Sequence, residues 1–367
     1  MPARPAPAAG EPAAGEPAAG EPAAGGIAVV GAGLAGLACA RALHAAGRIV
    51  TVFDKGRGVG GRACTRREEP GSGAALPFDH GAQYFTVKDD RFAPHVDDWR
   101  AEGVVAPWTG RLAAVEGDRF EVKETPGLLV GVPTMNALPR RLAEGLTVHA
   151  DRRVTALERT GAGWTLHVEA GPPAGAFAQV LVTAPAPQTA ALLDGHTDLT
   201  ATVRRAEHQA CWAALLAFDA APELPFDGAF LNDDRLPDGT PNPLAWAARE
   251  ASKPGRPPSP ERWTLHAKAD WSDANVDRDP AAVAPELIAA FTALVQNATG
   301  ETLPAPTFQS AHRWRFAHVK TAALIDGAGE CLYDPAAGLG AAGDWCVGGR
   351  VEGAFLSGLA LAERAAA

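Results

Sequence analysis

The chain has 367 residues, 47% of them hydrophobic, so it can bury a large core in two domains or in one discontinuous domain. Its formal net charge is −10, with acids and bases interspersed and no polybasic block, which argues against nucleic acid and anionic membranes as partners. The five cysteines form no CxxC pair, and HExxH and GxSxG are absent, so nothing supports a metal site or a serine hydrolase.

Residues 1–25 repeat a five-residue unit of Ala, Gly, Glu and Pro. A proline and a glycine in every unit forbid a continuous helix, and no side chain is large enough for a core, so we predict a disordered tail. The tail has no apolar h-region of a secretory signal, and the chain has no run of 18 apolar residues. We therefore expect a cytoplasmic protein without a membrane partner.

Residues 27–54 predict a strand, a tight turn, a helix and a second strand. Ile27–Val30 is a continuous apolar strand, and a helix is expected from Leu34 to Ala46 with Gly47 as its C-cap. The next strand closes on Asp54. Such a unit requires parallel strands joined by a right-handed crossover.

Later segments predict strands within 147–184, with a hairpin through residues 160–164, and a second domain from residue 206. The last residues again predict strand, Gly-Asp loop and helix, so both ends of the chain should share one sheet. The expected fold class is α/β, a Rossmann-like dinucleotide-binding domain with an inserted mixed-sheet α+β domain. The predicted boundaries are 26–86, 146–205 and 325–367 for the first domain, and 87–145 and 206–324 for the second.

Three spaced glycines in "GAGLAG" predict a site for the pyrophosphate of a dinucleotide. Gly31 permits the tight turn, Gly33 lets the backbone approach the ligand, and Gly36 lets helix pack on strand. The helix N-terminus adds free N–H groups and a positive dipole end. Asp54 lies where a carboxylate accepts hydrogen bonds from ribose hydroxyls and repels a 2′-phosphate. The alternative is an ordinary glycine-rich turn.

A second glycine pair, ending at Gly61, follows Asp54 closely. Flavoproteins of the amine-oxidase class use such a pair because the chain must turn back under the pyrophosphate. Arg62 could then offset phosphate charge with its fork-shaped donor. The alternative is a solvated loop arginine.

Two further motifs suit a flat ring. In "FDHGAQYFT" small residues let the backbone pass near a ring, and the Gln83 amide can bond to its polar edge, unless Gln83 and Tyr84 merely belong to a buried strand. In "AAGDWCVGGRVEGAFLSG", Asp344 can bond a ribityl hydroxyl. The helix that opens at Val351–Ala354 can stabilise an anionic reduced flavin, unless it is a capping helix without a ligand.

These motifs identify a resemblance. The sequence resembles the flavin-dependent amine-oxidase superfamily, and within it the renalase family, most closely its bacterial members. The resemblance runs from about residue 26 to 365 and is carried by "VVGAGLAGL", "FDKGRGVGGR", "DHGAQYFT", "VTAPAPQTAALL", "SKPGR", "WTLHAKADWS", "HRWRFA" and "GDWCVGGRVEGAFLSG". Of these, "DHGAQYF", "SKPGR" and "HRWRFA" are the most specific to the renalase family.

The resemblance implies bound FAD. We expect the FAD to be held non-covalently, because no cysteine lies in an attachment motif. Cys346 lies close enough to the C-terminal loop to leave covalent attachment as the alternative. Motifs and resemblance together predict these cofactor-binding residues: Gly31, Gly33, Leu34, Ala35, Gly36, Asp54, Lys55, Gly61, Arg62, Gln83, Tyr84, Val154, Asp344, Glu352, Gly353 and Ala354.

The resemblance also implies an activity, the oxidation of 2- and 6-dihydro isomers of NAD(P) to NAD(P)+, with O2 reoxidising the flavin and giving H2O2. Because the dihydropyridine nitrogen expels the hydride, no general base is required, and no catalytic side chain is assigned. Two departures, Thr134 in "VPTMNAL" and Ala251 in "ASKPGR", lie in the substrate half.

The expected substrate-lining residues are Tyr84, Thr86, Lys88, Trp246, Arg313 and Trp314. Lys88, Arg313 and Lys253 could meet the phosphates of a dinucleotide, although each could equally be a solvated surface residue. The tryptophans could equally pack a core. The ten histidines are assigned structural or surface roles.

Three rival functions stay open. An amine oxidase would flank the flavin with aromatic side chains and, with only Tyr84 and Tyr333 in the chain, would have to recruit tryptophan. A polyene desaturase or another oxidoreductase on the same fold is the second rival. The third, of a different class, is a non-catalytic flavin-binding protein, which would need the glycines and Asp54 only.

Overall fold

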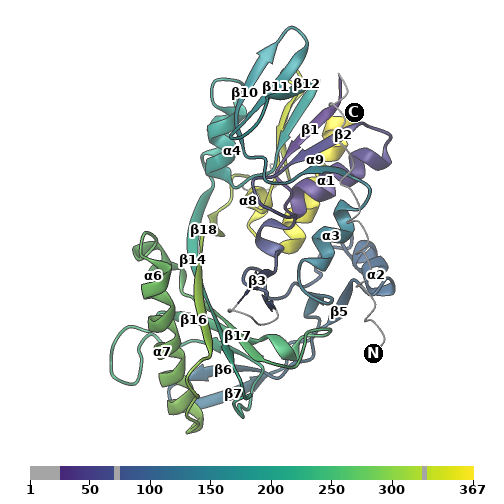
Figure 1. The fold of residues 1–367 in the computed structure, drawn as a ribbon. Helices are drawn as coiled ribbons and strands as arrows, with labels where there is room; N and C mark the ends of the chain where they lie inside the picture. Colours follow the sequence, from purple (N-terminus) through teal and green to yellow (C-terminus); the bar gives the residue numbers. More distant parts are fainter. Residues whose placement is uncertain (1–24, 70–74, 325–328) are drawn as a thin grey trace, which may run out of the picture.

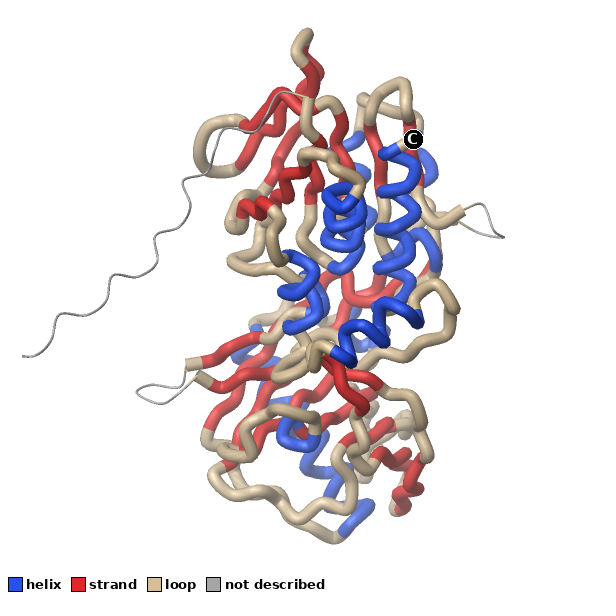
Figure 2. Tube along the Cα trace, turned by 90° about the vertical axis from the view of Figure 1, so that its right-hand side faces the viewer, coloured by secondary structure: helices blue, strands red, loops and turns tan. Residues whose placement is uncertain are grey.

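The computed structural model describes residues 25–69, 75–324 and 329–367, so the predicted tail lies outside the described residues except for its last one. Figure 1 shows two domains, each built on one large sheet and connected by the long strands β14 (Glu207–Phe218) and β18 (Phe308–Thr321). Figure 2, turned by 90°, shows one domain above the other, with the C-terminus in the upper, more helical one.

The upper domain contains a six-stranded sheet made from both ends of the chain, as predicted. Its strands are parallel except at one edge, where β19 pairs antiparallel with β20. In spatial order they are β19 (Leu332–Asp334), β20 (Leu339–Ala341), β13 (Gln179–Val182), β1 (Ile27–Val30), β2 (Val50–Phe53) and β9 (Thr147–His149).

Helices cover one face of this sheet and a small sheet covers the other. On the helical face α1 (Leu34–Ala45) packs against α9 (Val351–Ala366) and α3 (Ala137–Ala143). Gly358 lets α9 approach closely, since a Cβ there would lie 2.1 Å from the carbonyl oxygen of Ala35. The opposite face is covered by the antiparallel strands β10 (Val154–Thr160), β11 (Gly163–Val168) and β12 (Ala174–Phe177), the first two forming the predicted hairpin.

The lower domain is a seven-stranded mixed sheet. Its spatial order is β18, β14, β17 (Glu261–Ala267), β16 (Leu244–Arg249), β15 (Gly228–Leu231), β6 (Leu112–Glu116) and β7 (Arg119–Lys123). The helices α6 (Ala269–Ala274) and α7 (Pro280–Thr299) lie on one face. By length and composition alone α7 could cross a membrane, but its apolar side, which includes Phe291, is buried against Trp263 of the sheet.

Residues 87–145, expected in the second domain, are divided between the two. β6 and β7 join the seven-stranded sheet, whereas α2 (Ala93–Ala101) and α3 pack on the first domain. Aromatic contacts explain the division, because Phe92 and Trp99 lie 5.2 and 5.3 Å from Phe355 of α9, ring centre to ring centre.

The remaining elements are short connections between these layers. They are β3 (Arg66–Glu68), β4 (Leu76–Phe78), β5 (Val105–Pro107), β8 (Leu129–Gly131), α4 (Ala186–Leu193), α5 (Leu199–Val203), α8 (Asp344–Val347) and the 3-10 turns Gly61–Ala63 and Glu250–Ser252.

Candidate functional site

The three glycines after β1 form the turn that their spacing predicts. Gly31 has φ +113°, which favours glycine, and a Cβ on Gly36 would lie 1.9 Å from the Gly31 carbonyl oxygen. A Cβ on Gly33, by contrast, would meet nothing within 4 Å. The N-terminus of α1 at Leu34 and Ala35 has no side-chain cap and no acidic residue in its first turn. Its N–H groups therefore suit a phosphate group.

Asp54 lies at the end of β2, beside this turn. Its carboxylate accepts hydrogen bonds from the N–H of Ala32 at 2.5 Å and of Gly56 at 2.6 Å. Burial raises the pKa of Asp54, and these two N–H groups lower it only in part. The carboxylate is thereby fixed next to the glycine turn, where a ribose would lie.

The second glycine pair returns to the first, as predicted. Gly60 forms a parallel bridge with Gly33, and a Cβ on Gly61 would lie 3.4 Å from the Gly33 Cα. Gly60 and Gly61 both have positive φ, +121° and +53°. Two glycine segments thus lie side by side with little side-chain bulk between them, which is the space that a pyrophosphate requires.

Arg62 and Asp344, each predicted to contact FAD separately, bind one another. The guanidinium donates two hydrogen bonds to the carboxylate at 2.8 and 2.6 Å, and a third to the Ala317 carbonyl at 3.1 Å. The pair joins the second glycine segment to α8 and to β18. It would therefore face FAD as a neutral unit rather than as an arginine that offsets phosphate charge.

The other predicted cofactor residues surround the same edge of the sheet or the start of α9. Lys55 is exposed, with its Nζ 3.3 Å from Oε1 of Gln188, and Val154 is buried at the start of β10. Glu352, Gly353 and Ala354 form the first turn of α9. The Glu352 carboxylate accepts hydrogen bonds from the N–H of Lys88 at 2.7 Å and of Asp89 at 2.9 Å.

Gln83 does not present its amide as expected. Its Nε2 donates to the carbonyls of Asp79 and Gly81, and its Oε1 accepts a hydrogen bond from Nζ of Lys253 at 3.1 Å. The side chain is buried, and a buried amide must satisfy both ends. The amide is therefore committed to the protein and is not available for the polar edge of a flavin.

Lys253 is likewise no surface residue, because it belongs to a buried ionic cluster centred on Asp79. The Asp79 carboxylate pairs with Arg256, lies 3.8 Å from Nζ of Lys253, and accepts a hydrogen bond from the Thr65 hydroxyl at 2.7 Å. Burial alone would raise the pKa of Asp79, but the two cations more than offset it and hold the pKa below its usual range. The cluster ties "DHGAQYF" to "SKPGR".

Tyr84 lies beside two tryptophans. Its ring centre is 5.7 Å from that of Trp246 and 6.3 Å from that of Trp108, and Trp246 also packs on Phe230 at 4.8 Å. Tyr84 and Thr86 are half-buried, both tryptophans are buried, and the Lys88 side chain is exposed. Three of the predicted substrate residues, Tyr84, Thr86 and Lys88, thus lie on one segment of the chain. Trp246 of β16 packs against Tyr84 of this segment.

Arg313 does not join this group, contrary to expectation. Successive side chains of a strand point to opposite faces, and Arg313 points to the turn that follows α6, where it donates to the Val276 carbonyl and lies over the Trp212 ring of β14. Trp314 points the other way and donates from its indole N–H to the His80 carbonyl at 2.9 Å. Its ring lies 4.7 Å from that of His80, and burial lowers the pKa of this histidine well below its ordinary value.

Arg350 is a residue of this region that the sequence reasoning missed. It directly precedes α9 and is one of two non-glycine residues with positive φ among those that the structure describes. The available signal was its position after two glycines in "VGGRVEG".

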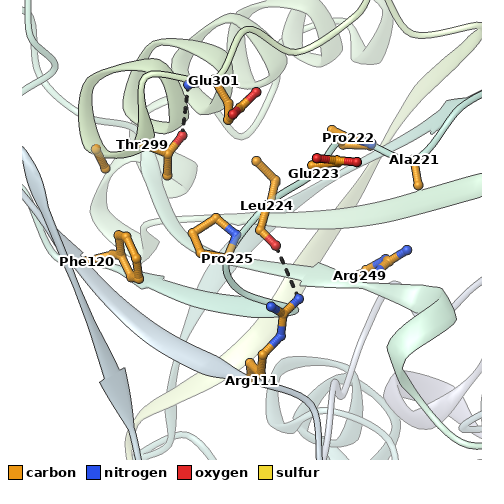
Figure 3. Close-up of a pocket in the computed structure, with 11 residues that line it drawn as sticks. Arg111, Phe120, Ala221, Pro222, Glu223, Leu224, Pro225, Arg249, Thr299 and Glu301 are labelled. Atoms are coloured by element: carbon orange, nitrogen blue, oxygen red, sulfur yellow. Dashed lines mark hydrogen bonds between the residues drawn. The ribbon is translucent and has the colours of Figure 1, made fainter.

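A groove of about 710 Å³ in the lower domain is lined by none of these residues (Figure 3). Two arginines in its lining are already neutralised, because Arg111 and Arg249 both pair with Asp227 and Arg249 pairs also with Glu261. The groove therefore offers no free arginine charge to a ligand.

The glycine turns, Asp54 and the inserted sheet domain define a dinucleotide-binding flavoprotein of two domains. Residues 29–99 match the family model of the NAD(P)-binding Rossmann-like domain, and residues 110–366 match that of the flavin containing amine oxidoreductases. The second match spans more than half of the chain, so the protein belongs to the flavin containing amine oxidoreductase family. FAD is its cofactor, and the glycine turns and Asp54 fit that group.

Solved structures share the fold. A protein provisionally named a protoporphyrinogen oxidase, from Exiguobacterium sp. 255-15, is 14% identical with a TM-score of 0.69, covering 94% of this chain and 99% of that one. A redesigned putrescine oxidase is 14% identical (TM-score 0.64; 93% and 98% covered). Cyclohexylamine oxidase from Brevibacterium oxydans IH-35A is 13% identical (TM-score 0.63; 94% and 99% covered). At such identities the likeness establishes the fold alone.

Cys346 should not hold FAD covalently. It is fully buried in α8, and burial raises the pKa of its thiol to about 12, so the nucleophilic thiolate is scarce at neutral pH. We expect acid precipitation of the protein to release all of its FAD into the supernatant. Cys346→Ser should retain the flavin equally well, whereas a yellow pellet from the wild type but not from this variant would contradict the prediction.

Proposed function

We propose that this protein is an FAD-dependent oxidase that takes hydride from the 2- and 6-dihydro isomers of NAD(P) and delivers the electrons to O2, giving NAD(P)+ and H2O2. The observation that carries the proposal is the convergence of three motifs. "DHGAQYF", "SKPGR" and "HRWRFA" meet through the Asp79–Arg256 pair, the Gln83–Lys253 hydrogen bond and the Trp314–His80 hydrogen bond, directly beside Tyr84.

When bound, FAD supplies the acceptor for a hydride and the route of electrons to O2. The residues of the chain have to hold the donor ring flat and close to the acceptor, at about 3–3.5 Å. The half-buried Tyr84 offers aromatic surface for such a ring, and its packing on the buried Trp246 and Trp108 fixes its position. No side chain has to remove a proton, because the lone pair of the ring nitrogen expels the hydride.

A second candidate is amine oxidation, which the same aromatic cluster favours. An amine oxidase built on this chain would have to recruit tryptophan, and Trp108 and Trp246 do lie beside Tyr84. Two of the similar structures are amine oxidases by name.

Anaerobic mixing of the holoenzyme with separate donors tests both candidates. We expect the 2- and 6-dihydro isomers to bleach the flavin band rapidly, whereas ordinary NADH and a panel of amines should not, and admitted air should give peroxide. Tyr84→Leu should slow the bleaching by at least about tenfold, because it removes a positioning ring. Tyr333→Leu, which changes the other tyrosine, on β19, is the matched control.

Each contrary outcome has its own meaning. Bleaching by amines alone would replace the proposal with amine oxidation. A flavin that no donor reduces would favour a binding protein without catalysis.

A further inference from the structure

We propose that Arg350, together with Lys88, forms an anion-recognition site beside Tyr84, which selects substrates that carry a phosphate or carboxylate group outside the oxidised ring. The inference rests on the proposed function in placing the substrate at Tyr84. It goes beyond that function in naming the charge of the substrate and the residues that recognise it.

Two segments far apart in the sequence are joined where Arg350 lies. Glu352, two residues later, accepts hydrogen bonds from the N–H of Lys88 and Asp89, four and five residues after Tyr84. On the other side, Gly349 lies against β18, since a Cβ there would be 3.8 Å from the Val319 Cβ. Arg350 is therefore held between the Tyr84 segment and the strand that carries Trp314.

The two cations are uncommitted within the described part of the chain. Arg350 and Lys88 are both exposed, and no carboxylate of residues 25–69, 75–324 and 329–367 forms an ion pair with either. Other arginines of this region do have carboxylate partners. Arg62 is paired with Asp344, and Arg91 is paired with Asp89 and Glu330. Burial raises the pKa of the Tyr84 phenol, and the charge of Arg350 offsets part of that rise, in keeping with a guanidinium near the phenol.

The backbone of Arg350 gives independent support for a role of its side chain. It has φ +76° and ψ 165°, a conformation that is essentially restricted to glycine, and it follows Gly348 and Gly349, which have φ +102° and +100°. A third glycine would relieve the strain. An arginine at this position implies that its side chain contributes something that offsets the strain.

The chemistry of the pair selects for anions. A guanidinium presents a planar fork of donors that matches phosphate or carboxylate, and a lysine adds a point charge. The dihydronicotinamide dinucleotides combine an uncharged dihydropyridine ring with a doubly charged pyrophosphate, so the ring can lie at Tyr84 while the pyrophosphate meets the cations. A protonated diamine would be repelled by the same charges.

Arg350→Gly is the decisive variant, because it removes the side chain and also relieves the backbone strain. Inorganic pyrophosphate is titrated into the holoenzyme, and perturbation of the visible flavin spectrum reports binding. We expect the dissociation constant to rise at least about tenfold in Arg350→Gly, with a melting temperature no lower than that of the wild type. Arg119→Ala removes an arginine with a 90% exposed side chain on strand β7 and should leave the dissociation constant for pyrophosphate unchanged.

Steady-state kinetics then identify the source of the anion. If the site recognises a phosphate group of the substrate, Arg350→Gly raises the KM of the dihydronicotinamide dinucleotides. It does not raise the KM of the dihydronicotinamide riboside, which lacks phosphate. If the site recognises a carboxylate group instead, succinate rather than pyrophosphate perturbs the flavin spectrum of the wild type, and Arg350→Gly abolishes this perturbation.

Two results would overturn the inference. One is a wild-type spectrum that responds to neither anion, and the other is equal anion binding by the wild type and Arg350→Gly. If dihydronicotinamides fail to reduce the flavin, the proposed function is wrong, but the anion titration still decides this inference.

Discussion

Gly36→Ala should abolish FAD binding and lower the free energy of unfolding by about 3 kcal/mol. The added Cβ would lie 1.9 Å from the Gly31 carbonyl oxygen and 2.5 Å from the Thr183 hydroxyl, so α1 would have to move away from β1. Gly31 cannot move easily, because its carbonyl oxygen accepts a hydrogen bond from the Thr183 hydroxyl at 3.0 Å and its N–H donates to the Phe53 carbonyl at 2.8 Å. Urea unfolding of the apoprotein and fluorescence titration with FAD measure the two effects separately.

Gly33→Ala is the matched control within the same motif. Gly33 has φ −77°, which alanine adopts freely, and its Cβ would meet nothing in the protein within 4 Å. We expect normal unfolding but FAD affinity weakened by at least about tenfold, because the methyl group would occupy the space of the pyrophosphate. Tight FAD binding by Gly33→Ala would show that the pyrophosphate does not approach this turn.

The sequence was sufficient for the parts of the fold that local rules determine. The run from Ile27 to Asp54 predicted β1, α1 and β2 to within one residue at each boundary, because apolar periodicity and glycine positions act over short distances. The shared sheet of the two chain ends was also predicted. The division of residues 87–145 was not, since it depends on aromatic contacts between α2 and α9 that no local pattern reveals.

The candidate site was predictable where glycine geometry defines it and not where side chains compete for partners. Gln83, Arg62 and Asp344 were each expected to face the cofactor, yet each binds another protein side chain. Arg313 was expected to line the substrate site, but side chains alternate between the two faces of a strand, and Arg313 lies on the face away from Trp314. A sequence does not reveal which face of a strand meets a helix. Arg350 was overlooked because its backbone conformation becomes visible only in three dimensions.

Asp79→Asn should destabilise the protein by about 3–5 kcal/mol, the cost of leaving a buried charge without its partner. The Asp79 side chain is fully buried, as are those of Arg256 and Lys253, so no water can replace the lost carboxylate. Because its pKa in the folded protein is depressed, the Asp79 contribution is fully present at neutral pH and is lost only in acid. Urea unfolding at pH 7 measures the difference from the wild type.

The exposed ion pair of Asp277 is the matched control. Its side chain is 79% exposed and pairs with Arg315 at 2.7 Å, so Asp277→Asn should cost less than about 1 kcal/mol. Lys253 keeps its pair with Glu250 at 3.2 Å, so Arg256 is the cation that loses its partner. Adding Arg256→Met to Asp79→Asn removes that cation, and the double variant should recover part of the lost stability. Equal losses for Asp79→Asn and Asp277→Asn would mean that the buried cluster does not hold "DHGAQYF" and "SKPGR" together. The convergence beside Tyr84 would then have to rest on the Gln83–Lys253 and Trp314–His80 hydrogen bonds and on backbone packing.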